Sequence, residues 1–219
     1  MAESPEQLSL ALLEVSEIVP PDHAENGVSI SRDALNALPI RAYQGPVHLI
    51  NNDDDLEQAV AQIRKEKLLG FDTETKPVFR RGVSHPPALL QLGGAEQAWI
   101  FQLRYLRKLS LLFTVLSDQR ITKAGVALTD DLKKLKEVHS FSPAGFRELG
   151  DLAHKLGYTQ TGLRTLAGLV LGFRISKREQ RSNWARNQLS PSQITYAATD
   201  AWVSRELYLG LSKRLNGRS

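Results

Sequence analysis

The chain has 219 residues, of which 42% are hydrophobic and 24% charged, a balance typical of a globular protein with one domain or at most two. It contains no cysteine, which excludes disulfides and thiolate metal sites and leaves oxygen or imidazole as the ligands of any metal. No apolar run approaches the roughly 20 residues that cross a bilayer, and the first residues lack the basic start of a signal peptide. We therefore expect a soluble, cytoplasmic protein.

The net charge of +4 is unevenly distributed along the chain. Residues 1–70 hold 5 Lys and Arg against 12 Asp and Glu, whereas residues 120–219 hold 17 against 8. A basic C-terminal half suits a polyanionic partner such as a nucleic acid. A solvated basic surface explains the same charge equally well, so the charge supports a nucleic-acid partner without establishing one.

The N-terminal segment is rich in acids and interrupted by prolines. We expect residues 1–44 to form an N-terminal extension that is partly mobile, because chain ends are poorly ordered unless other elements hold them. A short helix over residues 8–18 and one or two helical turns over residues 31–38 are compatible with its pattern.

From residue 45 onward, the spacing of hydrophobic residues predicts alternating strands and helices. In chain order these are a strand at 47–50, a helix at 54–66 capped by Asn52 or Asp53, a strand at 67–74, a hairpin of 88–92 and 98–101, a helix at 106–116, a strand at 121–126 and a helix at 130–138. A short strand and helix at 146–157, a helix at 163–171 and a long helix from Pro191 to about residue 215 follow. This order indicates an α/β domain with a mixed sheet.

Asp72 and Glu74 lie at the end of an apolar strand. Because successive side chains of a strand point to opposite faces, these two carboxylates share one face. Two carboxylates this close repel each other, so they need either solvent at an exposed strand end or a cation between them. The spacing alone favours the solvated strand end.

Asp130 and Asp131 lie where a strand runs into the start of a helix. Acids at a helix N-terminus accept hydrogen bonds from unpaired N–H groups and interact favourably with the helix dipole. We therefore expect one of the two to cap the helix, which leaves the other free to point elsewhere. Capping by itself is a sufficient explanation for both.

Tyr196 and Asp200 lie four residues apart in the last predicted helix, and this spacing places them on one face. The residues between them are small, so another backbone or a ligand can approach closely. Asp is unfavourable in the middle of a helix, which favours a function for it. A solvated helix face with a half-buried tyrosine also accounts for the pair.

Taken together, two strand ends and one helix supply four carboxylates, those of Asp72, Glu74, Asp131 and Asp200. Hard oxygen ligands of this kind are the ones that Mg²⁺ and Mn²⁺ prefer. Two such ions about 3.5–4 Å apart can hold the attacking and leaving oxygens of a phosphodiester. The sequence thus predicts a two-cation site for phosphodiester chemistry.

Three segments carry these acids: GFDTETKP at 70–77, AGVALTDDLKKL at 124–135 and LSPSQITYAATDA at 189–201. In sequence, order and spacing they resemble the motifs of the DEDDy 3′–5′ exonucleases, the family of ribonuclease D and the Werner-type exonuclease domain. The resemblance covers about residues 45–215. It implies a ribonuclease H-like fold, in which helices flank a mixed sheet, and it implies that residues 45–219 form the exonuclease domain.

The resemblance also implies a role for each acid. Asp72 bridges two divalent cations, Mg²⁺ or Mn²⁺. Glu74 and Asp200 complete the tighter of the two cation sites. Asp131 holds the second cation through water.

Two further assignments rest on the same motifs. We choose Asp131 over Asp130 because it lies six residues after Gly125, as the acid of the family's second motif does, and Asp130 remains the alternative. Tyr196 orients the attacking water, and it places the chain in the tyrosine rather than the histidine subclass.

A basic stretch, residues 174–186, precedes the helix with Tyr196 and Asp200. Its cations can hold phosphates, and Trp184 can stack on a base, although a packing role at the helix start is the favoured interpretation for Trp184. The proline-rich loop over residues 76–87 offers a second basic pair. The expected nucleic-acid contacts are Arg80, Arg81, Lys177, Arg178, Arg181, Trp184 and Arg186.

The resemblance predicts a metal-dependent exonuclease that hydrolyses single-stranded or 3′-recessed DNA or RNA from the 3′ end and releases nucleoside 5′-monophosphates. The main alternative is a catalytically silent nucleic-acid-binding module on the same fold. A third interpretation is a proofreading unit that serves a polymerase on a separate chain. The sequence leaves the choice between DNA and RNA and the oligomeric state open.

Overall fold

The computed structural model describes residues 27–78, 82 and 84–217. It contains a six-stranded sheet with the order β1-β4-β3-β2-β5-β6. The strands are β1 (Val47–Ile50), β2 (Leu68–Thr75), β3 (Pro87–Gly93), β4 (Ala98–Gln102), β5 (Thr122–Gly125) and β6 (Phe146–Glu148). β2, β3 and β4 pair antiparallel, and the other three strands join them in parallel. The predicted mixed sheet of an α/β domain is confirmed.

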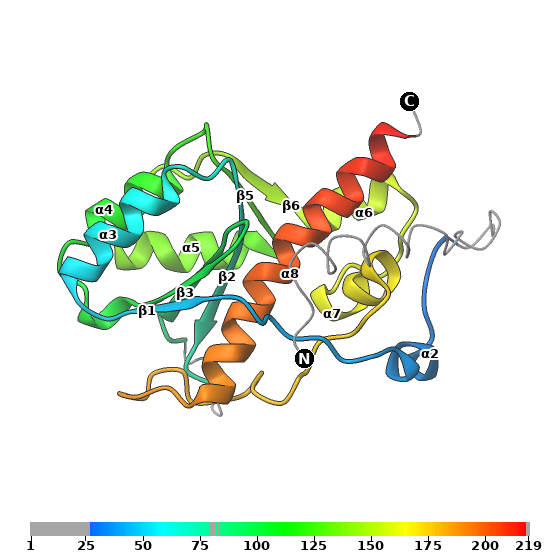
Figure 1. Cartoon of the computed structure of the whole chain (residues 1–219), viewed down its shortest axis with the longest axis horizontal. Helices are drawn as coiled ribbons and strands as arrows, with labels where there is room; N and C mark the ends of the chain where they lie inside the picture. Colours follow the sequence, from blue (N-terminus) through cyan, green and yellow to red (C-terminus); the bar gives the residue numbers. More distant parts are fainter. Residues whose placement is uncertain (1–26, 79–81, 83, 218–219) are drawn as a thin grey trace.

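Helices cover both faces of this sheet (Figure 1). They are α2 (Arg32–Ala37), α3 (Asp53–Ile63), α4 (Leu109–Leu116), α5 (Leu128–Val138), α6 (Leu149–Lys155), α7 (Leu163–Leu166) and α8 (Pro191–Asn216), with a 3-10 turn η2 (Leu103–Tyr105) and a π turn η3 (Ala167–Leu171). Among the helices of the described residues, none is both long enough and apolar enough to span a bilayer. The short helix expected over residues 8–18 lies outside the described residues.

The alternation of side chains along β2 separates two layers of the core. Leu69 and Phe71 point to one face, where they join a cluster with buried residues of α3, α4 and α5. On the opposite face, Leu89 and Ile100 of the neighbouring strands pack against α8. Asp72 and Glu74 share this second face, so they point toward α8 rather than toward the core under α3.

Glycines allow α8 to lie directly on the sheet. Gly70 of β2 and Gly93 of β3 are paired neighbours. A Cβ on Gly70 would lie 1.8 Å from the carbonyl oxygen of Ala201, and one on Gly93 would lie 2.8 Å from its carbonyl carbon. The close approach of this part of α8 places Asp200 at the level of β2.

Side-chain caps begin two of the helices, and the sequence predicted the cap of α3 and the start of α8 at Pro191. The Asn52 side chain accepts a hydrogen bond from the N–H of Asp55 at 2.9 Å and begins α3. Ser190 and Gln193 form a capping box at the start of α8, with Pro191 in the first turn. Both caps are local in sequence.

The start of α5 differs from the prediction. The helix begins at Leu128, and Asp130 and Asp131 lie in its first turn without capping it. The carboxylate of Glu148, the last residue of β6, accepts hydrogen bonds from the N–H groups of Ala127 at 3.0 Å and Leu128 at 2.8 Å. The expectation that Asp130 or Asp131 caps this helix is wrong, because a residue from β6 already occupies the unpaired N–H groups.

The described part of the N-terminal extension and the two residues that follow it form a strap along the domain, residues 27–46. Val28 makes a parallel bridge with Tyr158, and Ile40 makes one with Arg174. The chain then passes α8 to reach β1 (Figure 1), and the N–H of Tyr43 donates to Thr199 Oγ1 at 3.0 Å. Through these contacts the strap touches segments that are far from it in sequence.

Candidate active site

A pocket of about 470 Å³ opens where the end of β2 meets α5, α7 and α8. All four carboxylates predicted from the sequence line it: Asp72, Glu74, Asp131 and Asp200. Another part of the wall comes from α7 and the segment after η3. Its lining residues include Arg164, Thr165, Ile175, Ser176, Lys177 and Gln180.

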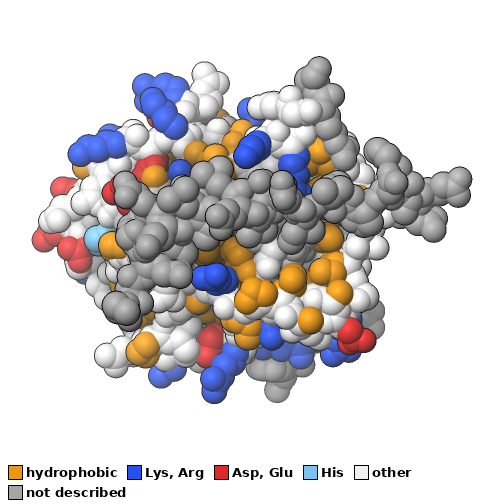
Figure 2. All heavy atoms as spheres, turned by 45° about the vertical axis from the view of Figure 1, so that its right-hand side comes forward, with side chains coloured by type: hydrophobic (Ala, Val, Ile, Leu, Met, Phe, Trp, Pro, Cys, Tyr) orange, Lys and Arg blue, Asp and Glu red, His pale blue; other side chains and the backbone are white. Residues whose placement is uncertain are grey.

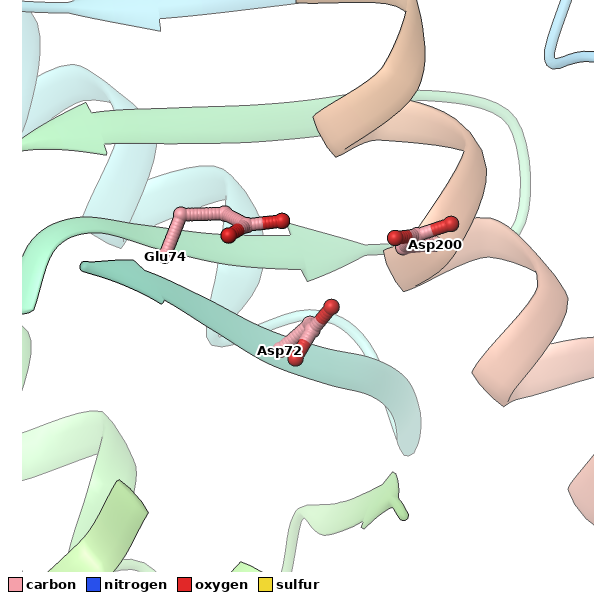
Figure 3. A group of neighbouring side chains, drawn as sticks. All are labelled: Asp72, Glu74 and Asp200. Atoms are coloured by element: carbon pink, nitrogen blue, oxygen red, sulfur yellow. The ribbon is translucent and has the colours of Figure 1, made fainter. Parts of the chain in front are cut away.

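Three of the acids form a tight group. Asp72, Glu74 and Asp200 each offer one carboxylate oxygen, and these oxygens all lie within 4.8 Å of one another. Figure 3 shows that the two side chains from β2 and the one from α8 point into a shared space. The strand periodicity sets the first two on one face, and the close packing of α8 adds the third.

Asp131 reaches the pocket from α5 and is not a member of the tight group. Its Oδ1 accepts a hydrogen bond of 2.5 Å from Thr73 Oγ1. Thr73 points to the other face of β2 from its two acidic neighbours, so it links Asp131 to the strand that carries them. Asp130 is exposed and is not among the residues that line the pocket.

Burial and mutual repulsion raise the pKa values of the grouped acids. Burial and then the charge of Asp131 raise the pKa of Asp72 to about 7, although the N–H of Thr73 donates to its Oδ1. Burial, followed by the charges of Asp72 and Asp200, raises the pKa of Glu74 to about 10. Burial and then Asp72 also raise the pKa of Asp200 well above its usual range. The group therefore resists carrying its full negative charge.

A divalent cation fits this group chemically. The Oδ1 atom of Asp200 is buried and has no hydrogen-bond partner among the described residues. No ion pair within the described chain involves Asp72, Glu74 or Asp200. Buried, unpaired carboxylates are costly, and hard oxygen donors are the ligands that Mg²⁺ and Mn²⁺ prefer. Asp72, Glu74 and Asp200 are therefore the residues that would hold such an ion.

This group predicts a stability that depends on pH in the absence of metal. Because the folded-state pKa values of Asp72 and Glu74, about 7 and about 10, exceed the unfolded values, the folded state binds more protons than the unfolded state. In EDTA, the contribution of these two groups to the free energy of unfolding should therefore be most favourable below about pH 4. It should fall as the pH rises through their raised pKa values. Thermal unfolding in EDTA and in Mg²⁺, from mildly acid to mildly alkaline pH, measures this.

Mg²⁺ should raise the unfolding temperature relative to EDTA, and this increase should grow with pH, because a cation competes with protons for the carboxylates. The Asp200→Asn variant serves as the control. It should unfold at a higher temperature than the natural protein in EDTA, by roughly 2–4 °C for each kcal/mol of relieved repulsion, and should lose most of the Mg²⁺ effect. A Mg²⁺ effect that is independent of pH would contradict proton-coupled binding.

Tyr196 lines the pocket one helical turn before Asp200. Burial and then the negative charge of Asp200 raise the pKa of its phenol above the ordinary value. The hydroxyl therefore stays protonated near neutral pH and can donate a hydrogen bond. Its ring centroid lies 5.7 Å from that of Trp184.

The predicted base contact by Trp184 is wrong. Trp184 is 1% exposed and belongs to a buried cluster with Leu89 and Leu189. A ring that already packs against Tyr196 and this cluster has no free face to offer a base. Trp184 has the packing role that the sequence favoured, and it supports Tyr196.

The predicted basic contacts separate into different places. Lys177 lines the pocket, whereas Arg178, Arg181 and Arg186 are exposed and are not among its lining residues. Where Figure 2 draws the described residues, the Lys and Arg side chains on that face form several separate groups. The other two expected contacts, Arg80 and Arg81, lie outside the described residues.

Sequence reasoning missed several polar residues of the pocket lining, among them Thr73, Arg164 and Ser204. Ser204 lies one helical turn after Asp200, so an extension of the spacing from Tyr196 would have found it. Thr73 lies between two predicted acids but on the opposite strand face. Arg164 enters from α7, and its position depends on packing that no local pattern reports.

Comparisons with known proteins identify the family of the chain. A family model described as 3′–5′ exonuclease matches residues 47–216. DNA polymerase I of Aquifex aeolicus is 28% identical over 167 residues, which are 76% of this chain and 27% of that protein. The chain spans less than half the length of the first curated relatives that it matches.

Solved structures show the same fold. Escherichia coli RNase D has a TM-score of 0.71 at 25% identity, over 81% of this chain and 46% of that one. Trypanosoma brucei RNase D in complex with RNA U12 has a TM-score of 0.69 at 18% identity, over 77% of this chain and 63% of that one. The architecture is therefore that of a ribonuclease H-like exonuclease domain, and the match of the family model over residues 47–216 shows that this chain belongs to the 3′–5′ exonuclease family.

Proposed function

We propose that the protein is an active 3′–5′ exonuclease that uses two divalent cations, Mg²⁺ or Mn²⁺, to hydrolyse phosphodiester bonds from the 3′ end of a nucleic acid. The observation that carries the proposal is the approach of Asp72, Glu74 and Asp200 to within 4.8 Å inside a pocket that Asp131 also lines. Membership of the 3′–5′ exonuclease family supports the type of reaction.

When bound, divalent cations lower the pKa of a coordinated water and stabilise negative charge on the phosphodiester. The protein contributes fixed positions for its own groups. β2 and α8 hold the three grouped carboxylates, and the hydrogen bond from Thr73 Oγ1 holds Asp131 at the pocket wall. The protonated hydroxyl of Tyr196 orients the attacking water, which assigns the chain to the DEDDy subclass. The products are nucleoside 5′-monophosphates.

We propose single-stranded or 3′-recessed nucleic acid as the substrate. Similar proteins include one solved with RNA U12 and one named a DNA polymerase, so relatives of this domain are associated with both RNA and DNA. Lys177 on the pocket wall can attract a strand of either kind by its charge. Rates on matched single-stranded DNA, single-stranded RNA and recessed duplex ends would rank the substrates.

The choice between Asp131 and Asp130 gives a sharp test of the proposed reaction. The Asp131→Asn variant should hydrolyse a 5′-labelled oligonucleotide about 10–100-fold more slowly in Mg²⁺ or Mn²⁺, because its carboxylate lines the pocket and bonds to Thr73. Asp130→Asn is the matched control and should keep the natural rate, since Asp130 is exposed.

The product ladder distinguishes the possible results. Stepwise shortening from the 3′ end that stops in EDTA supports the exonuclease. Strand binding without any shortening in Mg²⁺ or Mn²⁺ would instead identify a catalytically silent binding module. If both variants lose the same fraction of the hydrolysis rate, or if Asp130→Asn loses more, the role given to Asp131 is overturned.

A further inference from the structure

Arg164 is a cation among the residues that line the pocket of the carboxylates. Its side chain is half-buried and is fixed by two neutral acceptors. Nε donates to the carbonyl oxygen of Ile175 at 3.1 Å, and Nη2 donates to Asn36 Oδ1 at 2.9 Å. Its guanidinium is therefore held in one orientation, although both partners are uncharged.

The positive charge of Arg164 is not neutralised within the described part of the chain. No ion pair there involves Arg164. A fixed guanidinium without an acidic partner presents the donor geometry that suits phosphate oxygens. Its place in the pocket gives it access to a strand whose scissile bond lies at the carboxylates.

The strap, residues 27–46, holds the wall that carries Arg164. Besides the bond from Arg164 to Asn36, the strap accepts two hydrogen bonds from Arg174 Nε, at the carbonyl oxygens of Asn36 (3.1 Å) and Leu38 (3.0 Å). The buried side chain of Leu35 lies against Gly168 of η3, where a Cβ would come within 2.5 Å of Leu35 Cδ1. Side-chain and backbone contacts thus connect the strap to both ends of this wall.

We propose that Arg164 binds a phosphate of the nucleic-acid strand and that Asn36 of the strap is the positioning residue that orients it. Asn36 lies before residue 47, where the match to the family model begins. The inference rests on the proposed function for the identity of the ligand. It adds a binding residue, Arg164, that the sequence motifs do not contain.

The first test measures hydrolysis kinetics of the Arg164→Ala variant on a 5′-labelled single-stranded oligonucleotide. KM should rise about tenfold, in line with the loss of one charged hydrogen bond, whereas kcat should change little because the carboxylates stay in place. The Arg164→Lys variant keeps the positive charge but loses the planar guanidinium. Its KM should lie between those of the natural protein and of Arg164→Ala. The control variant Arg147→Ala removes an exposed arginine of β6 that does not line the pocket. Its KM and kcat should equal those of the natural protein.

The second test measures strand binding without turnover. In the Asp72→Asn background with Mg²⁺, the slope of log affinity against log salt should fall by about 0.7 when Arg164 is replaced, the value for one lost phosphate contact on a single strand. Arg147→Ala should leave the slope unchanged. An equal change in both variants would show an effect of net charge alone and would overturn the phosphate contact.

The role of Asn36 is tested by a double-mutant cycle. Asn36→Ala alone should raise KM about two- to fivefold, a part of the Arg164 effect. In the Arg164→Ala background the same change should have no further effect, because the residue that it positions is gone. If the two substitutions raise KM additively, Asn36 does not act through Arg164 and the positioning role is overturned. Thermal unfolding of each variant shows whether a change in KM comes instead from a loss of folding.

The outcomes for this inference and for the proposed function are distinguishable. If the natural protein binds strands with a salt slope that depends on Arg164 but does not hydrolyse them, the phosphate contact stands and the proposed function fails. If hydrolysis is metal-dependent while Arg164→Ala changes neither KM nor the salt slope, the proposed function stands and this inference is wrong.

Discussion

The Asp72→Asn variant is expected to lose exonuclease activity by at least about 100–1,000-fold, the usual cost of removing a group that stabilises charge in the transition state. Asp72 belongs to the group of three carboxylates within 4.8 Å, and its charge also acts on Glu74 and Asp200. Asparagine keeps the shape of the side chain but removes the charge that attracts a cation. Shortening of a 5′-labelled strand from its 3′ end measures the loss.

Two controls test whether the loss is specific to Asp72 and to the hydrolysis step. Asp151→Asn removes an exposed acid of α6 that does not line the pocket, and it should keep the natural rate. Strand binding by Asp72→Asn should persist, because Lys177 and Arg164 are untouched. Metal-dependent hydrolysis that survives in Asp72→Asn would falsify the assignment of the carboxylate group as the catalytic centre.

Gly70→Ala is expected to lower both stability and activity, although residue 70 does not line the pocket. The new Cβ would lie 1.8 Å from Ala201 O and 2.6 Å from Arg205 N, which are backbone atoms of α8. The helix must move away from the sheet, at a cost of about 3 kcal/mol, or roughly 6–12 °C in unfolding temperature. Asp200 moves with it, and a displacement of about 1 Å can reduce catalysis about 100-fold.

Gly217→Ala is the matched control for that substitution. Gly217 is exposed and does not line the pocket. A Cβ there would lie no closer than 3.4 Å to its neighbours, and its φ of −77° is one that alanine adopts readily. Thermal unfolding, together with calorimetric titration of Mg²⁺, would follow the fold and the carboxylate group separately. If Gly70→Ala has the unfolding temperature and the Mg²⁺ affinity of the natural protein, the close contact between α8 and the sheet does not determine the position of Asp200.

Short-range periodicity by itself determined much of the site. The alternation along a strand placed Asp72 and Glu74 on one face, and helical spacing placed Tyr196 and Asp200 together. The cap of α3 and the start of α8 at Pro191 also follow from the sequence, because both signals involve residues only a few positions apart. In each of these cases the interacting groups are close in sequence, so the backbone geometry alone relates them.

Other features were decided by tertiary structure alone. Glu148, rather than Asp130 or Asp131, accepts the hydrogen bonds at the start of α5, and Asp131 bonds instead to Thr73. Trp184 is buried against Tyr196, and Arg164 is held by Asn36. These contacts join residues that are distant along the chain. Their geometry depends on how whole elements pack, which the period of a strand or a helix does not specify.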